Sequence, residues 1–251
     1  MIEVRNINKS YGNKKVVDNV SFNIEEGKIT SFIGPNGAGK STVLSIISRL
    51  MDADSGEVFI DGKEIKEWDS KELSKKLSIL KQSNNLNIRL SIRELVSFGR
   101  FPYCEGKLKK EDEKIVDNAL EYMQLTDIQD KYLDELSGGQ RQRAYIAMIV
   151  AQDTDYILLD EPLNNLDMKH SAEMMKMLRK MVNDLGKTIV IVIHDINFAS
   201  CYSDTIVALK NGELIKHSET REMITEKSLS KLYDMDFNIR EVNNQKICIY
   251  F

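Results

Sequence analysis

Near the start of the chain, apolar positions alternate with polar ones. Val20, Phe22 and Ile24 are each separated by one polar residue, and this period of two is typical of a half-buried strand. The run 57–60 is apolar in three of its four positions and is followed by Asp61-Gly62, which predicts a strand that enters a hairpin turn. Asn211-Gly212, flanked by alternating apolar residues, predicts a second hairpin in the same way.

Other segments carry the patterns of buried strands and of helices. Tyr156 to Leu159 and Thr188 to Ile193 are short apolar runs, as expected for strands buried on both faces. Residues 174–181 are rich in methionine, and we interpret them as a helix face that packs on a sheet. One more helix is predicted where apolar residues recur at helical spacing, at Val43, Ile46, Ile47 and Leu50.

The middle of the chain, residues 82–152, changes from strand patterns to helical ones. Ser91-Ile92-Arg93-Glu94 has the spacing of a capping box that opens a helix. An amphipathic helix is expected behind the charged run 105–114, with apolar positions Ile115, Ala119, Leu120 and Met123. Because strands precede and follow this region, we interpret it as a helical insertion in an α/β core.

Composition and charge narrow the class of protein. The 251 residues hold 35 Lys and Arg against 39 Asp and Glu, a net charge of −4, which argues against bulk binding of nucleic acid. Cys104, Cys201 and Cys248 are far apart in the sequence, so we expect free thiols in a reducing compartment. No signal peptide is recognised, and apolar runs such as Ile189 to Ile193 are too short for a membrane span. We expect a cytosolic protein whose membrane role, if it has one, comes through a partner.

The strongest chemical motif is the phosphate loop, Gly34 to Ser41, which matches G-x-x-x-x-G-K-[ST] between a predicted strand, Ile29 to Ile33, and a helix. Its glycines let backbone N–H groups turn toward phosphate oxygens. Lys40 is expected to reach the β- and γ-phosphates, and Ser41 to bind Mg²⁺ through its hydroxyl. A plain glycine-rich turn is the alternative. The predicted nucleotide-binding residues here are Gly34, Pro35, Asn36, Gly37, Ala38, Gly39, Lys40, Ser41 and Thr42.

Two further motifs are weak alone and gain weight beside the phosphate loop. Asp160-Glu161 closes an apolar strand, where an acidic pair lies at the mouth of a nucleotide site in α/β proteins. Asp160 suits a role toward Mg²⁺ and Glu161 suits a base that polarises water, although an acidic strand end is commonly just solvated. Leu136-Ser137-Gly138-Gly139-Gln140, the signature loop, forms a capping box that leaves helix amides facing outward at residues 138–152. A simple helix cap is its alternative.

Together these motifs resemble the ATP-binding subunit of an ABC transporter over nearly the whole chain. Gly34 to Ser41 resembles the Walker A loop, Tyr156 to Glu161 the Walker B strand, and Leu136 to Gln140 the LSGGQ signature. Asn164 to Asp167 is similar to the D-loop, with Asn-Asn where many relatives have Ser-Ala. Three single residues also match: Gln82 the Q-loop glutamine, His194 the switch histidine, and Tyr11 the aromatic that stacks on adenine.

The resemblance implies an α/β P-loop ATPase core with an antiparallel β subdomain and an inserted helical subdomain, residues 83–152, within a single ATP-binding domain, 1–251. It also implies ATP and Mg²⁺ as cofactors. The catalytic residues implied are Glu161, His194, Lys40 and Gln82. The Mg²⁺ residues implied are Ser41, Gln82 and Asp160. The further nucleotide-binding residues implied are Tyr11, Ser137, Gly138, Gly139 and Gln140.

The resemblance implies partners as well. It predicts an ATP-dependent head-to-tail dimer in which each signature loop covers the partner's ATP, with transmembrane permease subunits docked beside Gln82 and residues 86–103. The chain would then lie at the cytoplasmic face of the membrane, held there by the permeases, and would serve a siderophore-binding protein indirectly. Gly99-Arg100-Phe101-Pro102-Tyr103 and Leu163 to Met168 resemble the ferric siderophore import branch, with cobalamin and haem importers as the alternative.

Two other classes fit less well. A non-transport ABC ATPase generally carries two cassettes or a long coiled coil, and this chain shows one cassette without sustained heptads. A P-loop nucleotide kinase would leave the signature loop and His194 unexplained.

Overall fold

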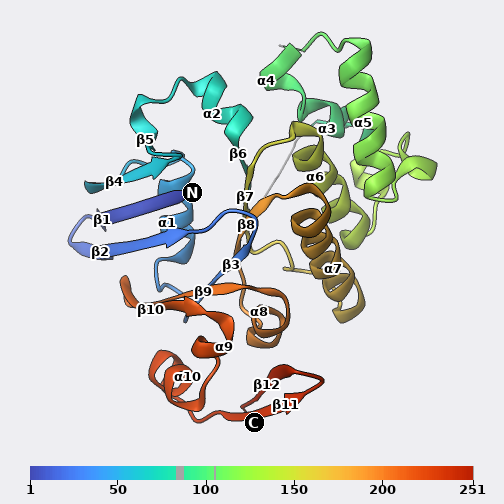
Figure 1. The fold of residues 1–251 in the computed structure, drawn as a ribbon. Helices are drawn as coiled ribbons and strands as arrows, with labels where there is room; N and C mark the ends of the chain where they lie inside the picture. The colour runs from blue at the N-terminus through green and yellow to red at the C-terminus, as the bar shows by residue number, and fades with distance from the viewer. Residues whose placement is uncertain (83–87, 105, 251) are drawn as a thin grey trace. The chain divides into compact units, whose positions relative to one another are not determined.

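The computed structural model describes residues 1–82, 88–104 and 106–250, and the chain folds into two compact units. The first unit comprises residues 1–68 and 175–251, and the second comprises residues 69–174. Helix α7, Met168–Leu185 (labelled in Figure 1), contains residue 174, the last of the second unit, and residue 175, at which the first unit resumes. The phosphate loop belongs to the first unit and the signature loop to the second.

The first unit begins with an antiparallel sheet in the order β2-β1-β4-β5. Val20, Phe22 and Ile24 of β2 are buried, whereas Ser21 and Asn23 between them are exposed, so the predicted alternation is confirmed. The predicted hairpin at Asp61-Gly62 joins β4 to β5. The elements of this part are β1 Ile2–Tyr11, β2 Lys14–Ile24, β3 Ile29–Ile33, α1 Lys40–Ile47, β4 Ser55–Ile60, β5 Lys63–Glu64 and the 3-10 helix Ile65–Glu67.

Strand β3, which leads into the phosphate loop, is the centre of a second group of strands. It pairs in parallel with β8, Thr188–Val192, and with β9, Thr205–Lys210. The hairpin predicted at Asn211-Gly212 connects β9 to β10, Glu213–Glu219, which is antiparallel. Every residue of β3 and β8 is buried, as expected for strands covered on both faces.

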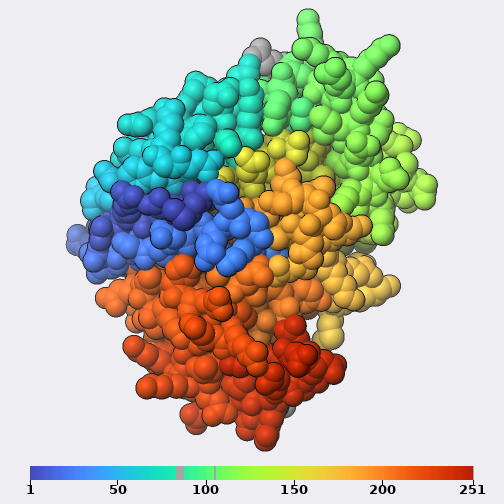
Figure 2. All heavy atoms as spheres, in the orientation of Figure 1, coloured from blue at the N-terminus to red at the C-terminus, as the bar shows by residue number. Residues whose placement is uncertain are grey.

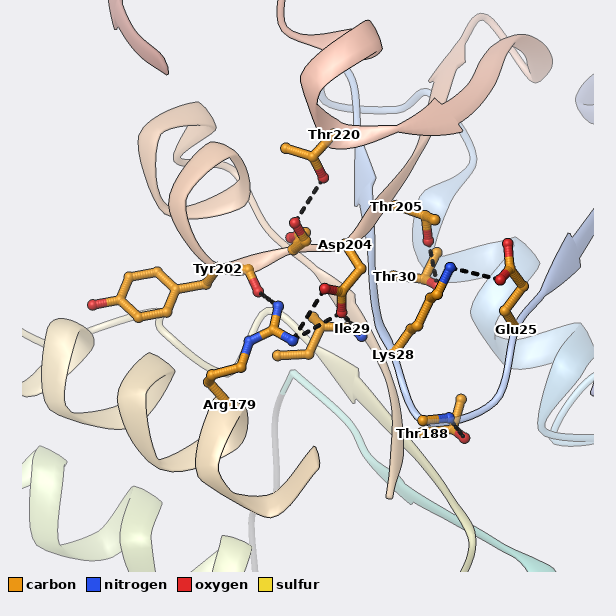
Figure 3. Close-up of polar contacts among 12 residues, drawn as sticks. Glu25, Lys28, Ile29, Thr30, Arg179, Thr188, Tyr202, Asp204, Thr205 and Thr220 are labelled. Carbon is orange, nitrogen blue, oxygen red and sulfur yellow. Dashed lines mark hydrogen bonds and ion pairs between the residues drawn. The ribbon is translucent and has the colours of Figure 1, made fainter. Parts of the chain in front are cut away.

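A polar network fixes the start of β3 and β9 (Figure 3). The Asp204 carboxylate accepts hydrogen bonds from the Arg179 guanidinium at 2.9 Å and from the Ile29 N–H at 2.7 Å. The Thr30 and Thr205 hydroxyls on the neighbouring strands pair at 2.8 Å. Since both Thr hydroxyls are buried, these bonds satisfy polar groups that water does not reach.

Helix α1 follows the phosphate loop and ends earlier than predicted. It spans Lys40–Ile47, with Ser48 as its C-cap. Leu50, expected on its apolar face, lies beyond the helix and is exposed. That expectation was wrong because Arg49 adopts a left-handed backbone, φ 57°, which stops the helix although the apolar spacing continues.

The C-terminal part of the first unit is formed by α8 Ile196–Tyr202, α9 Thr220–Met223, α10 Glu226–Tyr233, β11 Asn238–Val242 and β12 Gln245–Ile249. The β11–β12 hairpin is bound to α8: the Asn197 side chain accepts from the Cys248 N–H at 2.7 Å and donates to its carbonyl at 3.2 Å. Figure 2 shows the C-terminal part of this unit in orange and red, with the red end at the bottom of the view and the blue N-terminal strands of the same unit above it. The three cysteines are free thiols, as predicted.

The second unit is mainly helical around a parallel pair of strands, β6 and β7. Its elements are α2 Ser70–Lys76, β6 Leu77–Leu80, α3 Ile92–Phe98, α4 Phe101–Cys104, α5 Lys110–Tyr122, the 3-10 helices Thr126–Ile128 and Leu133–Glu135, α6 Gly138–Gln152 and β7 Tyr156–Asp160. Both predicted capping boxes, at Ser91 and at Ser137, are formed. The helical subdomain predicted for residues 83–152 falls inside this unit, with residues 83–87 outside the described ranges.

Candidate functional site

The phosphate loop closes around the ammonium group of Lys40. The Lys40 Nζ donates hydrogen bonds to the carbonyl oxygens of Gly34, at 2.8 Å, and Pro35, at 2.9 Å. The side chain is only 5% exposed, so the charge is oriented along the loop before any phosphate arrives. The loop also begins a helix, because the Val43 N–H bonds to the Gly39 carbonyl at 2.9 Å. A cation and a helix N-terminus therefore meet at the predicted anion site.

Neighbouring elements of the first unit hold the loop in place. The Gly212 N–H, in the β9–β10 turn, donates to the Ala38 carbonyl at 3.2 Å. Gly34 has φ +141°, and a Cβ there would lie 1.9 Å from the Leu209 carbonyl oxygen, so no other residue fits. The Gly34 N–H donates to the Tyr233 hydroxyl at 3.2 Å. The sequence indicated the loop and missed its contacts with Leu209 and Tyr233, which lie 175 and 199 positions further along the chain.

Two more predicted residues belong to the first unit. His194 follows β8 and is exposed, and Asp195 caps α8 by accepting from the Asn197 N–H at 2.8 Å. Tyr11 ends β1, is half exposed, and its hydroxyl contacts the Met51 sulfur at 3.0 Å. Both side chains therefore present a polar or aromatic surface to solvent, as contacts with a nucleotide would need.

In the second unit, Glu161 is held by two amide side chains. The Gln82 Nε2 donates to the Glu161 carboxylate at 2.6 Å, and the Asn164 amide donates to the same oxygen. Glu161 also has a left-handed backbone, φ 50°, which is uncommon for a non-glycine residue and is frequent at functional sites. Asp160, the last residue of β7, directly precedes it. The structure thus brings together Gln82 and Glu161, two of the residues predicted to be catalytic, and it adds Asn164.

The signature loop caps α6 and faces outward at its second and third positions. Ser137 and Gly138 are exposed; the Ser137 hydroxyl accepts from the Gln140 N–H at 3.3 Å, and the Gln140 side chain accepts from the Ser137 N–H at 3.1 Å. Gly139 is buried, and a Cβ there would lie 2.8 Å from the His170 ring. Packing against His170 is a reason for glycine that the sequence did not indicate.

His170 also joins this loop to the segment after β7. Its backbone N–H and its ring Nδ1 both lie 2.8 Å from Asp167 Oδ1. The backbone N–H of His170 lowers the pKa of the Asp167 carboxyl, with the ring adding to the effect. Asp167 therefore stays ionised and keeps the start of α7 fixed beside the signature glycine.

A family model described as ABC transporter matches residues 17–164, more than half of the chain. The chain belongs to the ABC transporter family. It is an ATP-binding cassette ATPase with the α/β cassette fold, including the antiparallel β subdomain and the helical subdomain.

Among its relatives, two petrobactin import ATP-binding proteins are similar to this cassette over its whole length. The petrobactin import ATP-binding protein YclP of Bacillus subtilis is 65% identical, with 100% of each chain covered. The petrobactin import ATP-binding protein FatE of Bacillus anthracis is 45% identical, also with 100% of each covered. Their full-length match covers the phosphate loop, the signature loop and the C-terminal segment alike.

A solved ABC cassette has the same fold. The dimeric structure of a post-hydrolysis state of MJ0796 bound to ADP and Pi has a TM-score of 0.78 and 35% identity, covering 88% of this chain and 99% of that one. The cassette fold predicted from the motifs is therefore confirmed.

Proposed function

We propose that this ABC cassette hydrolyses ATP to power the import of a ferric siderophore through partner permeases. The observation that carries the proposal is the 65% identity, over the full length of both chains, to a petrobactin import ATP-binding protein. A second petrobactin import protein at 45% identity supports the same cargo class. Import of cobalamin or haem, the alternative from the sequence, is an outcome that the test below separates.

The nucleotide would be held mainly by the phosphate loop. Lys40 is placed to neutralise the β- and γ-phosphates, because its ammonium already lies along the loop carbonyls. Backbone N–H groups at the start of α1 add donors for phosphate oxygens. The Tyr11 ring, half exposed at the end of β1, would stack on adenine.

The residues predicted for Mg²⁺ fit its chemistry. Ser41, Gln82 and Asp160 offer hydroxyl, amide and carboxylate oxygens, which Mg²⁺ prefers. The Gln82 nitrogen is bonded to Glu161, so the oxygen end of that amide is the one that would face a metal. In the described ranges no three His, Cys, Asp or Glu side chains are grouped around a common point, which suits a site completed by phosphates. Bound Mg²⁺ would neutralise charge that develops on the phosphate oxygens.

Glu161 is proposed as the group that orients or deprotonates the attacking water. Its carboxylate is fixed by Gln82 and Asn164, so it needs little rearrangement when the nucleotide binds. His194, exposed at the end of β8, would donate to the γ-phosphate. When hydrolysis removes that phosphate, the contacts of Glu161 and His194 would change.

A head-to-tail dimer would complete each site. Ser137 and Gly138 are exposed at the N-terminus of α6, where helix amides favour an anion. MJ0796, similar in sequence and fold, is dimeric in a post-hydrolysis state. We propose that the signature loop of each copy covers the ATP of the other, through Ser137, Gly138, Gly139 and Gln140.

The permease surface is proposed on α3, α4 and the segment before α3 in the second unit. Ile88, which precedes α3, is 65% exposed, and Phe98 and Phe101 are 51% and 58% exposed. Large apolar side chains exposed to solvent in one region favour a protein partner. Leu86, also predicted for this surface, lies outside the described residues. None of the helices within the described ranges is long and apolar enough to cross a bilayer, so attachment at the cytoplasmic face would depend on the permeases.

Deleting the gene tests the proposal directly. Uptake of radiolabelled iron from ferric petrobactin, and growth on it under iron limitation, should be lost; the wild-type gene should restore both, and the Lys40→Ala variant should restore neither. Unchanged iron uptake together with lost cobalamin or haem uptake would contradict the siderophore assignment and leave the ATPase intact.

A further inference from the structure

The first residue of the phosphate loop is held by three different elements of the first unit. The Gly34 carbonyl accepts from Lys40 at 2.8 Å. Its Cα packs on the Leu209 carbonyl, where even a methyl group has no room. Its N–H donates to the Tyr233 hydroxyl at 3.2 Å. Gly34 therefore connects the catalytic lysine to the end of helix α10.

Tyr233 is itself firmly fixed. Its ring packs against Phe237, with centroids 5.9 Å apart, and Phe237 packs against Tyr250 at 5.7 Å. Lys210, which follows Leu209 in β9, donates to the Lys231 carbonyl at 2.8 Å and to Asp234 at 2.6 Å. The end of β9 therefore packs on Gly34 through Leu209 and binds the end of α10 through Lys210. The same strand and helix thus fix both the Leu209 and the Tyr233 contacts of Gly34.

The Tyr233 hydroxyl is buried, and burial keeps it neutral. Burial raises the pKa of Tyr233 to about 12, so the phenol stays protonated at any pH at which the cassette works. A neutral hydroxyl adds no negative charge beside the loop that must receive phosphates. Removing it would strand the Gly34 N–H without a partner.

We propose that Tyr233 is a positioning residue for ATP binding. By accepting the Gly34 N–H, it fixes the first peptide of the phosphate loop, and the Gly34 carbonyl in turn fixes the direction of the Lys40 side chain. The C-terminal segment is in this way part of the nucleotide site, although it lies outside the residues that the family model matches. The proposal rests on ATP binding by the cassette and is independent of its cargo.

Tyr233→Phe tests this role because it removes one oxygen and keeps the ring. The dissociation constant for ATP, measured on the purified full chain with a fluorescent ATP analogue, should rise about five- to tenfold, because ATP must then order a loop peptide that the wild type holds in place before binding. The KM for ATP should rise by a similar factor while kcat changes less than twofold, because the bond shapes the loop before the nucleotide arrives. A purely structural role would lower the unfolding temperature and leave both ATP constants unchanged.

Tyr202→Phe is the matched control, since Tyr202 lies on α8 of the same unit and its ring packs on Phe198 at 6.2 Å; its ATP affinity should equal that of the wild type. If Tyr233→Phe does not fold, Lys210→Met, which releases the end of α10, replaces it and should weaken ATP binding at least twofold. An ATP dissociation constant within twofold of the wild type, in whichever of the two variants folds, would overturn the proposal.

Discussion

A buried ion pair in the second unit should make a large, measurable contribution to stability. The Arg100 Nε donates to Asp112 at 3.0 Å, and the two side chains are 7% and 8% exposed. The guanidinium also donates to the Ala151 carbonyl at 2.9 Å and lies 3.9 Å from the Tyr103 ring centre. Asp112 in turn accepts the Lys109 N–H at 3.0 Å. The ion pair therefore joins α5, which carries Asp112, to the end of α6, which Arg100 contacts through the Ala151 carbonyl.

Asp112→Asn keeps the shape and removes the charge, which leaves Arg100 buried without its counter-ion. Breaking one partner of such a pair costs about 3–5 kcal/mol. With an m value of about 3 kcal/mol/M, the urea midpoint for unfolding should fall by about 1 M or more. Asp117→Asn is the control, because Asp117 pairs with Arg93 on the surface and is 57% exposed; its cost should stay below about 1 kcal/mol.

The difference between the wild type and Asp112→Asn should depend on pH. The backbone N–H of Lys109, with Arg100 adding to it, lowers the pKa of Asp112. The native state therefore releases this proton at lower pH than the unfolded state, whose carboxyl titrates near about 3.9. The stabilisation is fully present above that value and is lost as the pH falls through the folded pKa. Equal urea midpoints for the Asp112 and Asp117 variants at neutral pH would refute the reasoning.

Two further predictions concern the ATP cycle. Lys40→Ala should abolish ATP binding and hydrolysis, because it removes the main protein charge on the phosphates, and near-normal ATPase activity would contradict the assignment. Glu161→Gln should bind ATP without hydrolysing it, and should elute as a dimer with Mg-ATP and a monomer with ADP in size-exclusion chromatography, since each charge-assisted hydrogen bond across the dimer contributes about 1.5–3 kcal/mol. Adding Ser137→Arg should return that variant to a monomer by filling the phosphate-facing cap, so a persistent dimer would show that the signature loop does not close the partner's site.

Features set by neighbouring residues could be predicted from the sequence. Strand β3 and helix α6 have the bounds expected, Ile29–Ile33 and Gly138–Gln152. The capping boxes formed because the Ser hydroxyl and the Glu or Gln three residues later satisfy each other's backbone donors locally. The hairpins at Asp61-Gly62 and Asn211-Gly212 depend on turn chemistry within two residues. Each of these signals is complete within a few positions of the chain.

Contacts that depend on distant segments could not be predicted in this way. Leu50 continued the helical spacing, but the left-handed Arg49 ended the helix. Gly139 fits a signature loop by its type alone, and its packing against His170 depends on a segment about thirty positions later. The Tyr233 contact with Gly34 joins residues 199 positions apart. In each case the physical cause is a neighbour that only the folded chain supplies.

Residues Gly99 to Tyr103 resemble the siderophore import branch in sequence, but they differ from one another in what they contact in the structure. A permease was expected to dock beside this region, and the structure divides its residues by burial. Arg100 is fixed by Asp112 and the Ala151 carbonyl, and the Tyr103 hydroxyl donates to the Gln152 carbonyl at 3.1 Å. Phe98 and Phe101 remain more than half exposed. Substitutions at Arg100 or Tyr103 would therefore disturb the helices before they affected a partner. Variants that test permease docking should be made at Phe98 and Phe101, where an apolar side chain can be lost without leaving a buried polar group unpaired.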